Sequence, residues 1–295
     1  MALRGTSSQK TKSFNNPIVL LIDLDHTLQG DIRPQIMEYE LVKEINRSIT
    51  NGTKIRYNVP RLYSDFRNGL LRPGVSSLMN IKKRHPNIEM FVYTASEHEW
   101  ANYIVPKLEQ VAFDGKFFNR PILTRKHVGK DGIKSIRGVQ PIVERTLIRK
   151  YGDGLKQIQY PIYLIDNNEV LAPVERKHLV KCPTYNFIYM IDPFRTIPDD
   201  IVHNHNSFTA IANYFGVPAQ LRSNHYSSME YIYIKINNDL LSKEKSRQLI
   251  DVDDNNKIYA KDMYWKRVAA VFSKSNLDHV NEIARVFNLI KHLNA

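Results

Sequence analysis

Four short apolar runs, separated by helical patterns, constrain the fold of this chain more than any other feature. They span residues 18–22, 88–93, 162–165 and 187–191, and β-branched and aromatic residues are frequent in them. Runs of this length and composition are typical of buried strands in a parallel sheet. Between them, apolar residues recur at helical spacing in 75–82 and 100–111. Strands that alternate with helices predict an α/β fold with a mostly parallel sheet.

Two regions depart from this alternation and set the expected domain organisation. Residues 28–70 form an insertion directly after the first strand, and residues 218–295 follow the alternating core of residues 17–217. Within the C-terminal part, alternating isoleucines predict a strand at 230–236, and apolar spacing predicts a helix at 277–293 capped by Ser275 and Asp278. We therefore expect a C-terminal α+β accessory module. Residues 1–16 are polar and predict a flexible tail.

A helix start is predicted after the second strand. Ser96 is followed three residues later by Glu99, which is the spacing of a capping box. In such a box the serine side chain accepts a hydrogen bond from the first turn of the helix. We therefore expect the helix that contains 100–111 to start just after the second strand.

Composition narrows the class of protein. The chain has 295 residues, of which 42% are hydrophobic, which is enough for a core without covalent cross-links. Its single cysteine excludes an internal disulfide framework and is typical of a reducing, intracellular compartment, cytoplasmic or nuclear. No run of about 18 apolar residues is present, and the N-terminus lacks the apolar segment of a secretory signal. We therefore expect no association with a membrane.

The positive charge is concentrated in one segment. The whole chain carries a formal net charge of +12, and residues 116–150 contain ten basic and two acidic residues. A run of this kind is either a solvated face or an electropositive rim that attracts an anionic partner. A phosphorylated protein and a nucleic acid are both partners of that kind, and the charge alone does not choose between them.

Polar residues follow three of the predicted strands. The sequences are Asp23-Leu24-Asp25-His26-Thr27, then Thr94-Ala95-Ser96, then Asp166-Asn167-Asn168. Ligands of open α/β sheets bind outside the carboxyl ends of the strands, so these residues are expected to meet in one site. Each motif taken alone is also a common turn or helix cap. The three together, each directly after an apolar strand, favour a functional site.

These residue types fit phosphoryl chemistry. Asp23 can attack phosphorus and become an aspartyl phosphate, while Asp25 can protonate the leaving oxygen and later activate water. Asp166 is expected to face Asp23, and two such carboxylates repel unless a hard cation such as Mg²⁺ lies between them. Thr94 can bind a phosphate oxygen, and Thr27 can contact phosphate or order the loop.

Four sequence blocks resemble a known family. The chain is similar to the Mg²⁺-dependent phosphatases of the haloacid-dehalogenase superfamily, and most similar to the branch of RNA polymerase II C-terminal-domain (CTD) phosphatases, small CTD phosphatases included. The resemblance covers about residues 17–217. The matching blocks are Leu21-Ile22-Asp23-Leu24-Asp25-His26-Thr27-Leu28, Leu71-Arg72-Pro73-Gly74-Val75, Tyr93-Thr94-Ala95-Ser96 and Leu164-Ile165-Asp166-Asn167.

The resemblance implies a role for each residue of the site. Asp23 becomes the nucleophile and Asp25 the general acid and base. The implied Mg²⁺ ligands are Asp23, Asp166 and the Asp25 backbone carbonyl, with Asn167 beside them. The family's phosphate-binding lysine is most similar to Lys134 within Gly132-Ile133-Lys134-Ser135-Ile136, while Lys126, Lys130 and Lys150 stay as alternatives. The implied phosphate-binding residues are Thr27, Thr94, Ala95 and Lys134.

The resemblance also implies the overall function. It predicts a Mg²⁺-dependent phosphomonoester hydrolase that acts through an aspartyl phosphate, with a phosphorylated protein as substrate and serine or threonine as the phosphorylated residue. The 28–70 insertion falls where this branch carries a small β-rich insert that helps to choose the substrate. Two alternatives remain. One is a nucleic-acid 3′-phosphatase that uses the basic 116–150 segment, and the other is a scaffold that retains the fold without turnover.

Overall fold

The computed structural model describes residues 16–49, 54–157, 159–189, 191–241, 260–275, 277 and 280–294. The tail predicted at 1–16 falls outside this part of the chain except for its last residue, and so does Asp278 of the predicted helix cap. Within these ranges, no helix is long and apolar enough to cross a membrane.

A parallel five-stranded sheet forms the centre of the described structure. Its strands are β1 (Ile18–Ile22), β2 (Ile88–Tyr93), β3 (Asn119–Leu123), β4 (Ile162–Asp166) and β5 (Leu179–Lys181). The order across the sheet is β3-β2-β1-β4-β5, and every neighbouring pair is parallel. The predicted α/β fold with a mostly parallel sheet is confirmed. β1 is central and buried along its whole length, so the residues that follow it are held from both sides.

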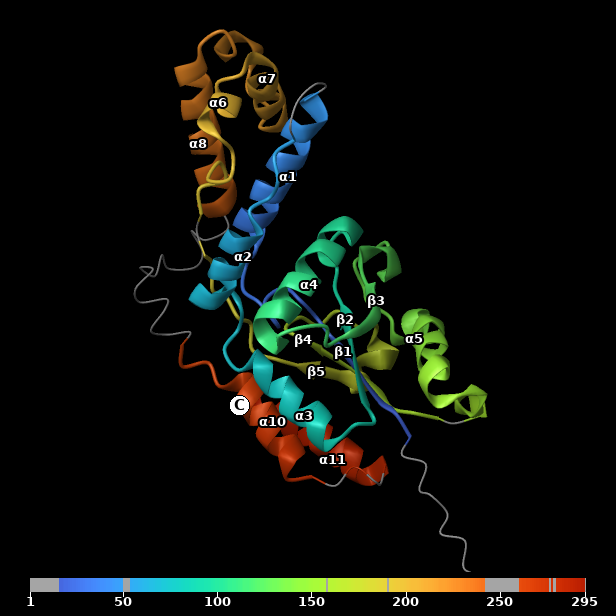
Figure 1. The fold of residues 1–295 in the computed structure, drawn as a ribbon. Helices are drawn as coiled ribbons and strands as arrows, with labels where there is room; N and C mark the ends of the chain where they lie inside the picture. The colour runs from blue at the N-terminus through green and yellow to red at the C-terminus, as the bar shows by residue number, and fades with distance from the viewer. Residues whose placement is uncertain are drawn as a thin grey trace, which may run out of the picture.

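Helices cover both faces of the sheet (Figure 1). Alternate residues of β1 point to opposite faces: Ile18 and Leu20 join one hydrophobic cluster, and Val19 and Leu21 join another. The first cluster also contains residues of α3 (Leu78–Arg84), α4 (His98–Phe113), α10 (Tyr264–Ser273) and α11 (Val280–Lys291). The second contains α5 (Ile136–Tyr151).

A helical arm projects from this layered core (Figure 1). It is built from α1 (Arg33–Ser48), α6 (Asp199–Val202), α7 (His205–Tyr214) and α8 (His225–Leu241). Its own cluster joins Leu41 and Ile45 of α1 to Ile211 of α7 and Ile232 of α8. Shorter elements connect these parts: α2 (Val59–Asp65), η1 (Phe66–Leu70), η2 (Val75–Ser77), η3 (Arg125–His127), η4 (Asp153–Gln157), η5 (Pro173–His178), η6 (Ala219–Leu221) and η7 (His292–Asn294).

The predicted helices are found where their apolar spacing placed them. The 75–82 pattern forms η2 and α3, the 100–111 pattern lies within α4, and the 277–293 pattern forms α11. α4 starts just after β2, as predicted, but the capping box was wrong, because the N-cap residue is Glu97 and no side chain caps the helix. The described part of the 28–70 insertion is helical, not β-rich.

Two predicted strands are wrong. Residues 230–236 lie in α8, because Ile232 and Ile236, four residues apart, are both buried on one helix face while Ile234 is 54% exposed. Residues near Ile188 form a single bridge to Asp31, because this segment has left the sheet after β5 and pairs with the loop that follows β1.

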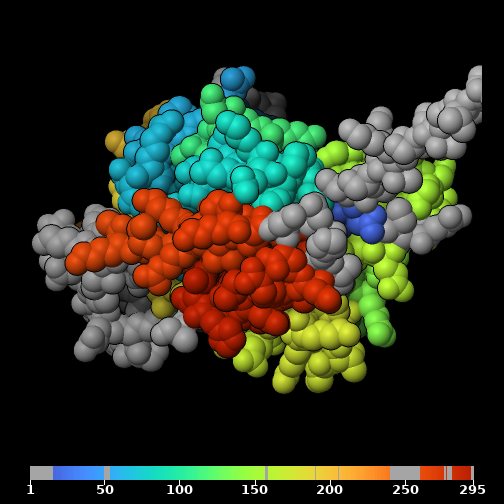
Figure 2. All heavy atoms as spheres, turned by 90° about the horizontal axis from the view of Figure 1, so that it is seen from below, coloured from blue at the N-terminus to red at the C-terminus, as the bar shows by residue number. Residues whose placement is uncertain are grey.

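The C-terminal region does not form one module within the residues described. α8 packs into the arm, whereas α10 and α11 belong to the main core cluster. Figure 2 shows α10 and α11 side by side across the underside of the molecule, next to the segment that contains α3. The expected boundary at residue 217 therefore does not coincide with a change of packing, because α10 and α11 return to the sheet.

Candidate active site

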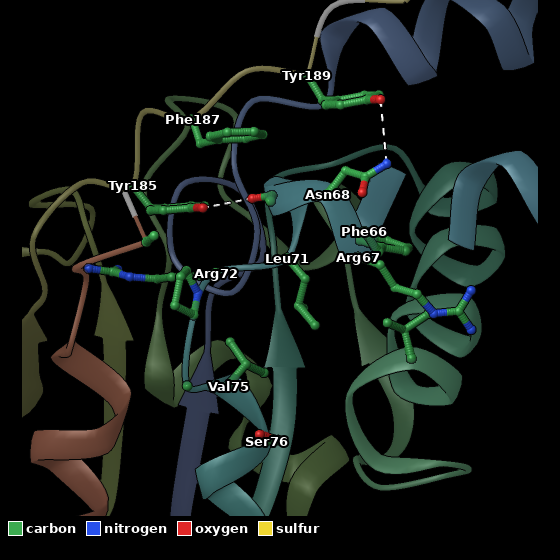
Figure 3. Close-up of a pocket in the computed structure, with 15 residues that line it drawn as sticks. Phe66, Arg67, Asn68, Leu71, Arg72, Val75, Ser76, Tyr185, Phe187 and Tyr189 are labelled. Carbon is green, nitrogen blue, oxygen red and sulfur yellow. Dashed lines mark hydrogen bonds between the residues drawn. The ribbon is translucent and has the colours of Figure 1, made fainter. Parts of the chain in front are cut away.

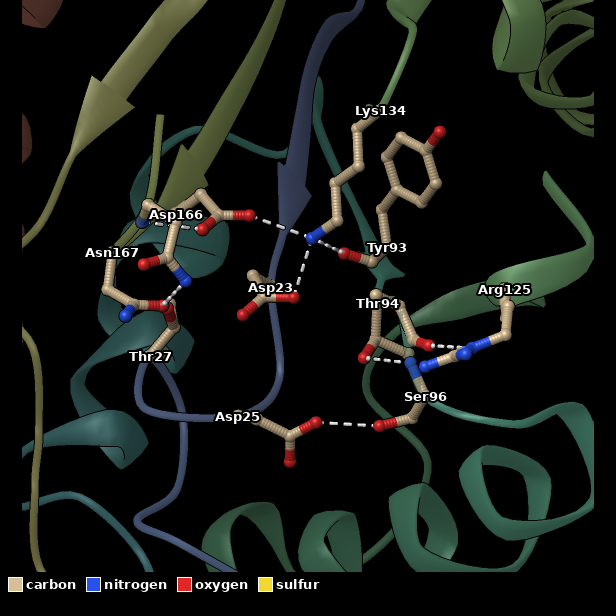
Figure 4. A network of polar contacts seen from close by, with 12 residues as sticks. Asp23, Asp25, Thr27, Tyr93, Thr94, Ser96, Arg125, Lys134, Asp166 and Asn167 are labelled. Carbon is tan, nitrogen blue, oxygen red and sulfur yellow. Dashed lines mark hydrogen bonds and ion pairs between the residues drawn. The ribbon is translucent and has the colours of Figure 1, made fainter. Parts of the chain in front are cut away.

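The loop after β1 carries two of the predicted acids. Asp23 follows the strand directly, and its backbone N–H donates to the Ile165 carbonyl at 2.9 Å. The chain then turns sharply, since Leu28 donates its N–H to Leu24 at 2.9 Å and His26 has a φ of 59°. This left-handed conformation is uncommon for a residue other than glycine. The turn sends the Asp25 side chain away from the strand, toward the start of α4 (Figure 4).

Lys134 joins the two carboxylates that were expected to face each other (Figure 4). Its Nζ donates to Asp23 Oδ1 at 2.6 Å, to Asp166 Oδ2 at 2.7 Å and to the Tyr93 carbonyl at 2.7 Å. The ends of β1, β2 and β4 therefore meet at one buried ammonium group. The loop that precedes α5 delivers this lysine, and its backbone N–H bonds to Val170.

The alternative lysines lie elsewhere. Lys126 and Lys130 are exposed, and Lys150 pairs with Glu89 at the end of α5. The structure therefore places Lys134 between the acids and leaves the other three outside.

The second acid, Asp25, is held by two side chains. Ser96 Oγ donates to Asp25 Oδ2 at 2.6 Å, and Gln29 Nε2 donates to Asp25 Oδ1 at 3.0 Å. Sequence reasoning missed both donors. Ser96 was interpreted as a helix cap, and its position in the Tyr93–Ser96 block was the available signal for a role in the site.

The segment after β2 brings the predicted phosphate ligands beside Asp25. Thr94 is fully buried, donates its N–H to the Leu123 carbonyl at 2.9 Å, and accepts at Oγ1 from the Ser96 N–H at 3.1 Å. The Ala95 carbonyl accepts from Arg125 Nε at 2.8 Å, and Arg125 also pairs with Glu97 at 3.1 Å. Arg125 was counted only as part of the basic segment, yet it lies against this loop (Figure 4).

The Thr27 side chain points toward Asn167, in the Asp166-Asn167-Asn168 motif that follows β4. Its side chain is fully buried, and Oγ1 donates to Asn167 Oδ1 at 3.3 Å. Asp166 is held in turn, because its Oδ1 accepts the Asn168 N–H at 2.8 Å. Thr27 therefore links the loop after β1 to the loop after β4, and its contact with phosphate stays a prediction.

The electrostatics of the site are dominated by buried negative charge. Burial, together with the nearby carboxylates of Asp166 and Asp25, raises the pKa of Asp23 to about 7, although Lys134 opposes this shift. Burial alone would lower the pKa of Lys134, but the attraction of Asp23 and Asp166 outweighs it and raises that pKa. One ammonium group thus lies between two carboxylates and cannot neutralise both. A further cation would therefore be electrostatically favourable in the site.

The donor set fits a hard divalent cation. Within the described ranges, no group of three or more His, Cys, Asp and Glu side chains forms a metal cluster. Asp23 and Asp166 nevertheless converge on one cation, Lys134 Nζ, and the Asn167 amide lies beside them (Figure 4). Two carboxylates supplemented by amide and backbone carbonyl oxygens are ligands that Mg²⁺ accepts.

A separate cavity of about 770 Å³ lies nearby (Figure 3). Arg67, Arg72, Tyr185, Phe187 and Tyr189 are among its lining residues. None of the acids of the site lines it. Its wall nevertheless contacts the loop that follows β1, because the Tyr185 N–H donates to the His26 carbonyl at 2.9 Å.

Comparison with known proteins gives limited similarity. No protein-family model matches the chain, and no curated protein matches it. One similar solved structure is a variant of the fission yeast RNA polymerase II CTD phosphatase Fcp1 bound to beryllium fluoride, with 15% identity, 93% of this chain and 70% of that chain covered, and a TM-score of 0.35. A second Fcp1 structure has 15% identity, coverage of 83% and 70%, and a TM-score of 0.33.

Proposed function

We propose that this chain is a phosphomonoester hydrolase that acts through an aspartyl phosphate on Asp23. The observation that carries the proposal is the shared ammonium group. Lys134 holds Asp23 beside Asp166, while Asp25 lies on the same loop and is oriented separately by Ser96. Two acids in different surroundings can divide the nucleophilic and proton-transfer roles.

The reaction follows from these positions. The Asp23 carboxylate attacks phosphorus and the bond to the ester oxygen breaks, while Asp25 donates its proton to the leaving oxygen. A water molecule then attacks the phosphorus of the aspartyl phosphate and gives its proton to Asp25. This hydrolysis releases phosphate and restores Asp23. Lys134 and the Thr94 segment bind the phosphate oxygens as cation and hydrogen-bond donors.

Magnesium completes the proposed site. Asp23, Asp166, the Asp25 carbonyl and Asn167 would hold it. When bound, the ion neutralises charge on the phosphoryl group. The Lys134 ammonium group would then share the neutralisation of Asp23 and Asp166 with the ion and would supply a further positive charge for the phosphate.

The proposed substrate is a protein phosphorylated on serine or threonine. This choice follows the family that the sequence blocks resemble. Exposed cations are compatible with it: the Arg125 side chain is 65% exposed and donates to the Ala95 carbonyl, and Lys126 and Lys130 follow it in exposed positions. They favour a polyanionic substrate but do not distinguish a phosphopeptide from a nucleic acid. The basic 116–150 segment also keeps a nucleic-acid 3′-phosphate as the second substrate to be tested.

The first test is hydrolysis of phenyl phosphate with Mg²⁺ or EDTA. We expect metal-dependent turnover in the wild type and a loss of at least about 1,000-fold in Asp23→Asn, as for other catalytic nucleophiles. Asp153→Asn is the matched control, because the Asp153 side chain is 84% exposed and makes only a surface ion pair. Metal-dependent turnover that survives Asp23→Asn would contradict the proposal. No turnover in the wild type would favour the scaffold alternative.

A phosphoserine peptide and a 3′-phosphorylated oligonucleotide then separate the two substrate classes. Faster cleavage of the peptide supports the protein phosphatase, and exclusive cleavage of the oligonucleotide rejects it.

A further inference from the structure

The catalytic loop is tied to a helix near the far end of the chain. The Thr27 carbonyl, two residues after Asp25, accepts a hydrogen bond from Trp265 Nε1 at 3.1 Å. Trp265 lies in α10 and is fully buried. A buried hydrogen bond of this kind fixes the loop backbone in a way that packing alone does not, because it is directional.

Arg72 adds a second link between the same two segments. Its Nη1 donates to the Thr27 carbonyl at 3.4 Å and to the Pro183 carbonyl at 2.8 Å. Its Nη2 pairs with Asp262 at 2.9 Å, just before α10. Figure 3 shows Arg72 beside Tyr185 in the cavity behind the loop. The Thr27 carbonyl therefore has two donors, and both belong to a buried assembly that includes the start of α10.

The backbone of the loop that contains Asp25 and Thr27 is strained at His26. His26 has a φ of 59°, a strained conformation that persists only where its surroundings enforce it. Asp25 precedes His26 and must keep its carboxyl group within proton-transfer reach of a leaving oxygen. Thr27 directly follows His26 and lies two residues after Asp25. A Thr27 carbonyl that is held in place therefore restricts the backbone at both residues.

We propose that Trp265 is a positioning residue for the catalytic loop, and that it acts on Asp25 through the Thr27 carbonyl. The inference rests on the proposed function for its effect on catalysis. It assigns α10 a part in the reaction although none of its side chains touches the acids. Asp25 donates the proton to the leaving group, so a loop that loses this support loses general acid catalysis first.

Leaving-group dependence distinguishes positioning from simple loss of stability. Phenyl phosphate has a poor leaving group and needs the proton from Asp25, whereas p-nitrophenyl phosphate has a good one and depends on that proton far less. Trp265→Phe keeps an aromatic ring but removes the N–H. We expect kcat/KM, which reports the step in which the leaving group departs, to fall about tenfold for phenyl phosphate, a fraction of the full contribution of general acid catalysis, and about twofold or less for p-nitrophenyl phosphate.

Val268→Ala is the matched control. Val268 is also fully buried in α10, but its side chain carries no donor. Its substitution lowers stability through a cavity, so any effect on kcat/KM should be equal for the two esters. An equal effect of Trp265→Phe on both esters, or none on either, would overturn the proposal.

Hydrogen exchange of the folded proteins supplies a readout that does not need activity. The backbone N–H groups of Leu28 and Gln29 donate to Leu24 within the loop. We expect Trp265→Phe to speed exchange at 24–29 more than at β1, and Val268→Ala not to do so. If the wild type hydrolyses neither ester but this local change appears, positioning of the loop stands and the proposed function fails. If exchange in the loop is unchanged, positioning itself is rejected.

Asp262→Asn is a second variant in case Trp265→Phe does not fold. It weakens the pair with Arg72 at a position that is partly accessible, since the Asp262 side chain is 16% exposed. We expect a smaller change of the same kind, with phenyl phosphate more affected than p-nitrophenyl phosphate. Equal rates on both esters, relative to the wild type, would count against the link through Arg72.

Discussion

At the scale of single residues, Lys134 controls the charge of the site. Its side chain is 2% exposed and lies between two carboxylates that are almost as buried. Breaking a buried ion pair by removing one partner typically costs about 3–5 kcal/mol, because the other charge is left uncompensated. We therefore expect Lys134→Met to lower the free energy of unfolding of the metal-free protein by about that amount near pH 8.

This loss should depend on pH and on Mg²⁺. Without the ammonium group, the pKa of Asp23 rises further above about 7. A carboxyl group whose pKa is raised by folding stabilises the protein at low pH, and that stability is lost as the pH rises through the folded-state pKa. Denaturant unfolding should therefore show a smaller deficit at pH 5 than at pH 8, and added Mg²⁺ should recover part of it. The exposed Lys130→Met is the control. A deficit that is independent of both pH and Mg²⁺ would contradict this account.

The residues of the site differ in how far the sequence could reveal them. Asp23, Asp25, Thr94 and Asp166 each follow an apolar strand, so the strand ends alone predicted that they would meet. Ser96 lay in a block of the same kind but was assigned to a cap, because a capping box and a donor to Asp25 have the same local sequence. Trp265 could not be linked to Thr27, because no spacing relates two residues 238 positions apart.

At the scale of elements, burial decided which strands could be predicted. β1, β2 and β4 lie inside the sheet, and because they are buried their sequences are apolar and were recognised as strands. β3 lies at one edge and begins with Asn119, Arg120 and Pro121, and β5 at the other edge has only three residues. The 230–236 segment shows the opposite error. Isoleucines spaced two residues apart fit a strand, but Ile232 and Ile236 are four residues apart and also fit one face of a helix. Packing against α1 and α7 favours the helix.

The junction of the arm with the core offers a test at the same scale. Arg195 Nη2 contacts Glu38 Oε2 of α1 at 3.1 Å and Asp65 Oδ2 of α2 at 2.5 Å, and both carboxylates are buried. Arg195→Ala removes the cation that both carboxylates share, so we expect the free energy of unfolding, measured in urea, to fall by about 3–5 kcal/mol. The exposed Arg149→Ala should change stability by less than about 0.5 kcal/mol. A similarly small change in Arg195→Ala would show that this junction does not depend on its ion pairs.

At the scale of the whole molecule, the basic 116–150 segment contains two groups of exposed cations. Arg125 lies against the Thr94–Ser96 loop, and Lys126 and Lys130 follow it in the sequence before Lys134, whereas Arg145 and Arg149 lie along the second half of α5. An electropositive rim and a solvated face were both open interpretations of this segment. If the segment is a rim, the effect of a charge on substrate binding depends on its position. If the segment is a solvated face, that effect depends only on the total charge.

Two charge-reversed variants separate these interpretations. Lys126→Glu combined with Lys130→Glu changes the net charge by the same amount as Arg145→Glu combined with Arg149→Glu, but nearer the site. If the rim attracts substrate, the first pair should lower kcat/KM for an acidic phosphopeptide about tenfold at low salt, and the difference should shrink as salt screens the charges. Hydrolysis of phenyl phosphate, which has little charge beyond its phosphate, should change much less. Equal losses in the two variants would mean that only the total charge acts, and that the 116–150 segment is a solvated face.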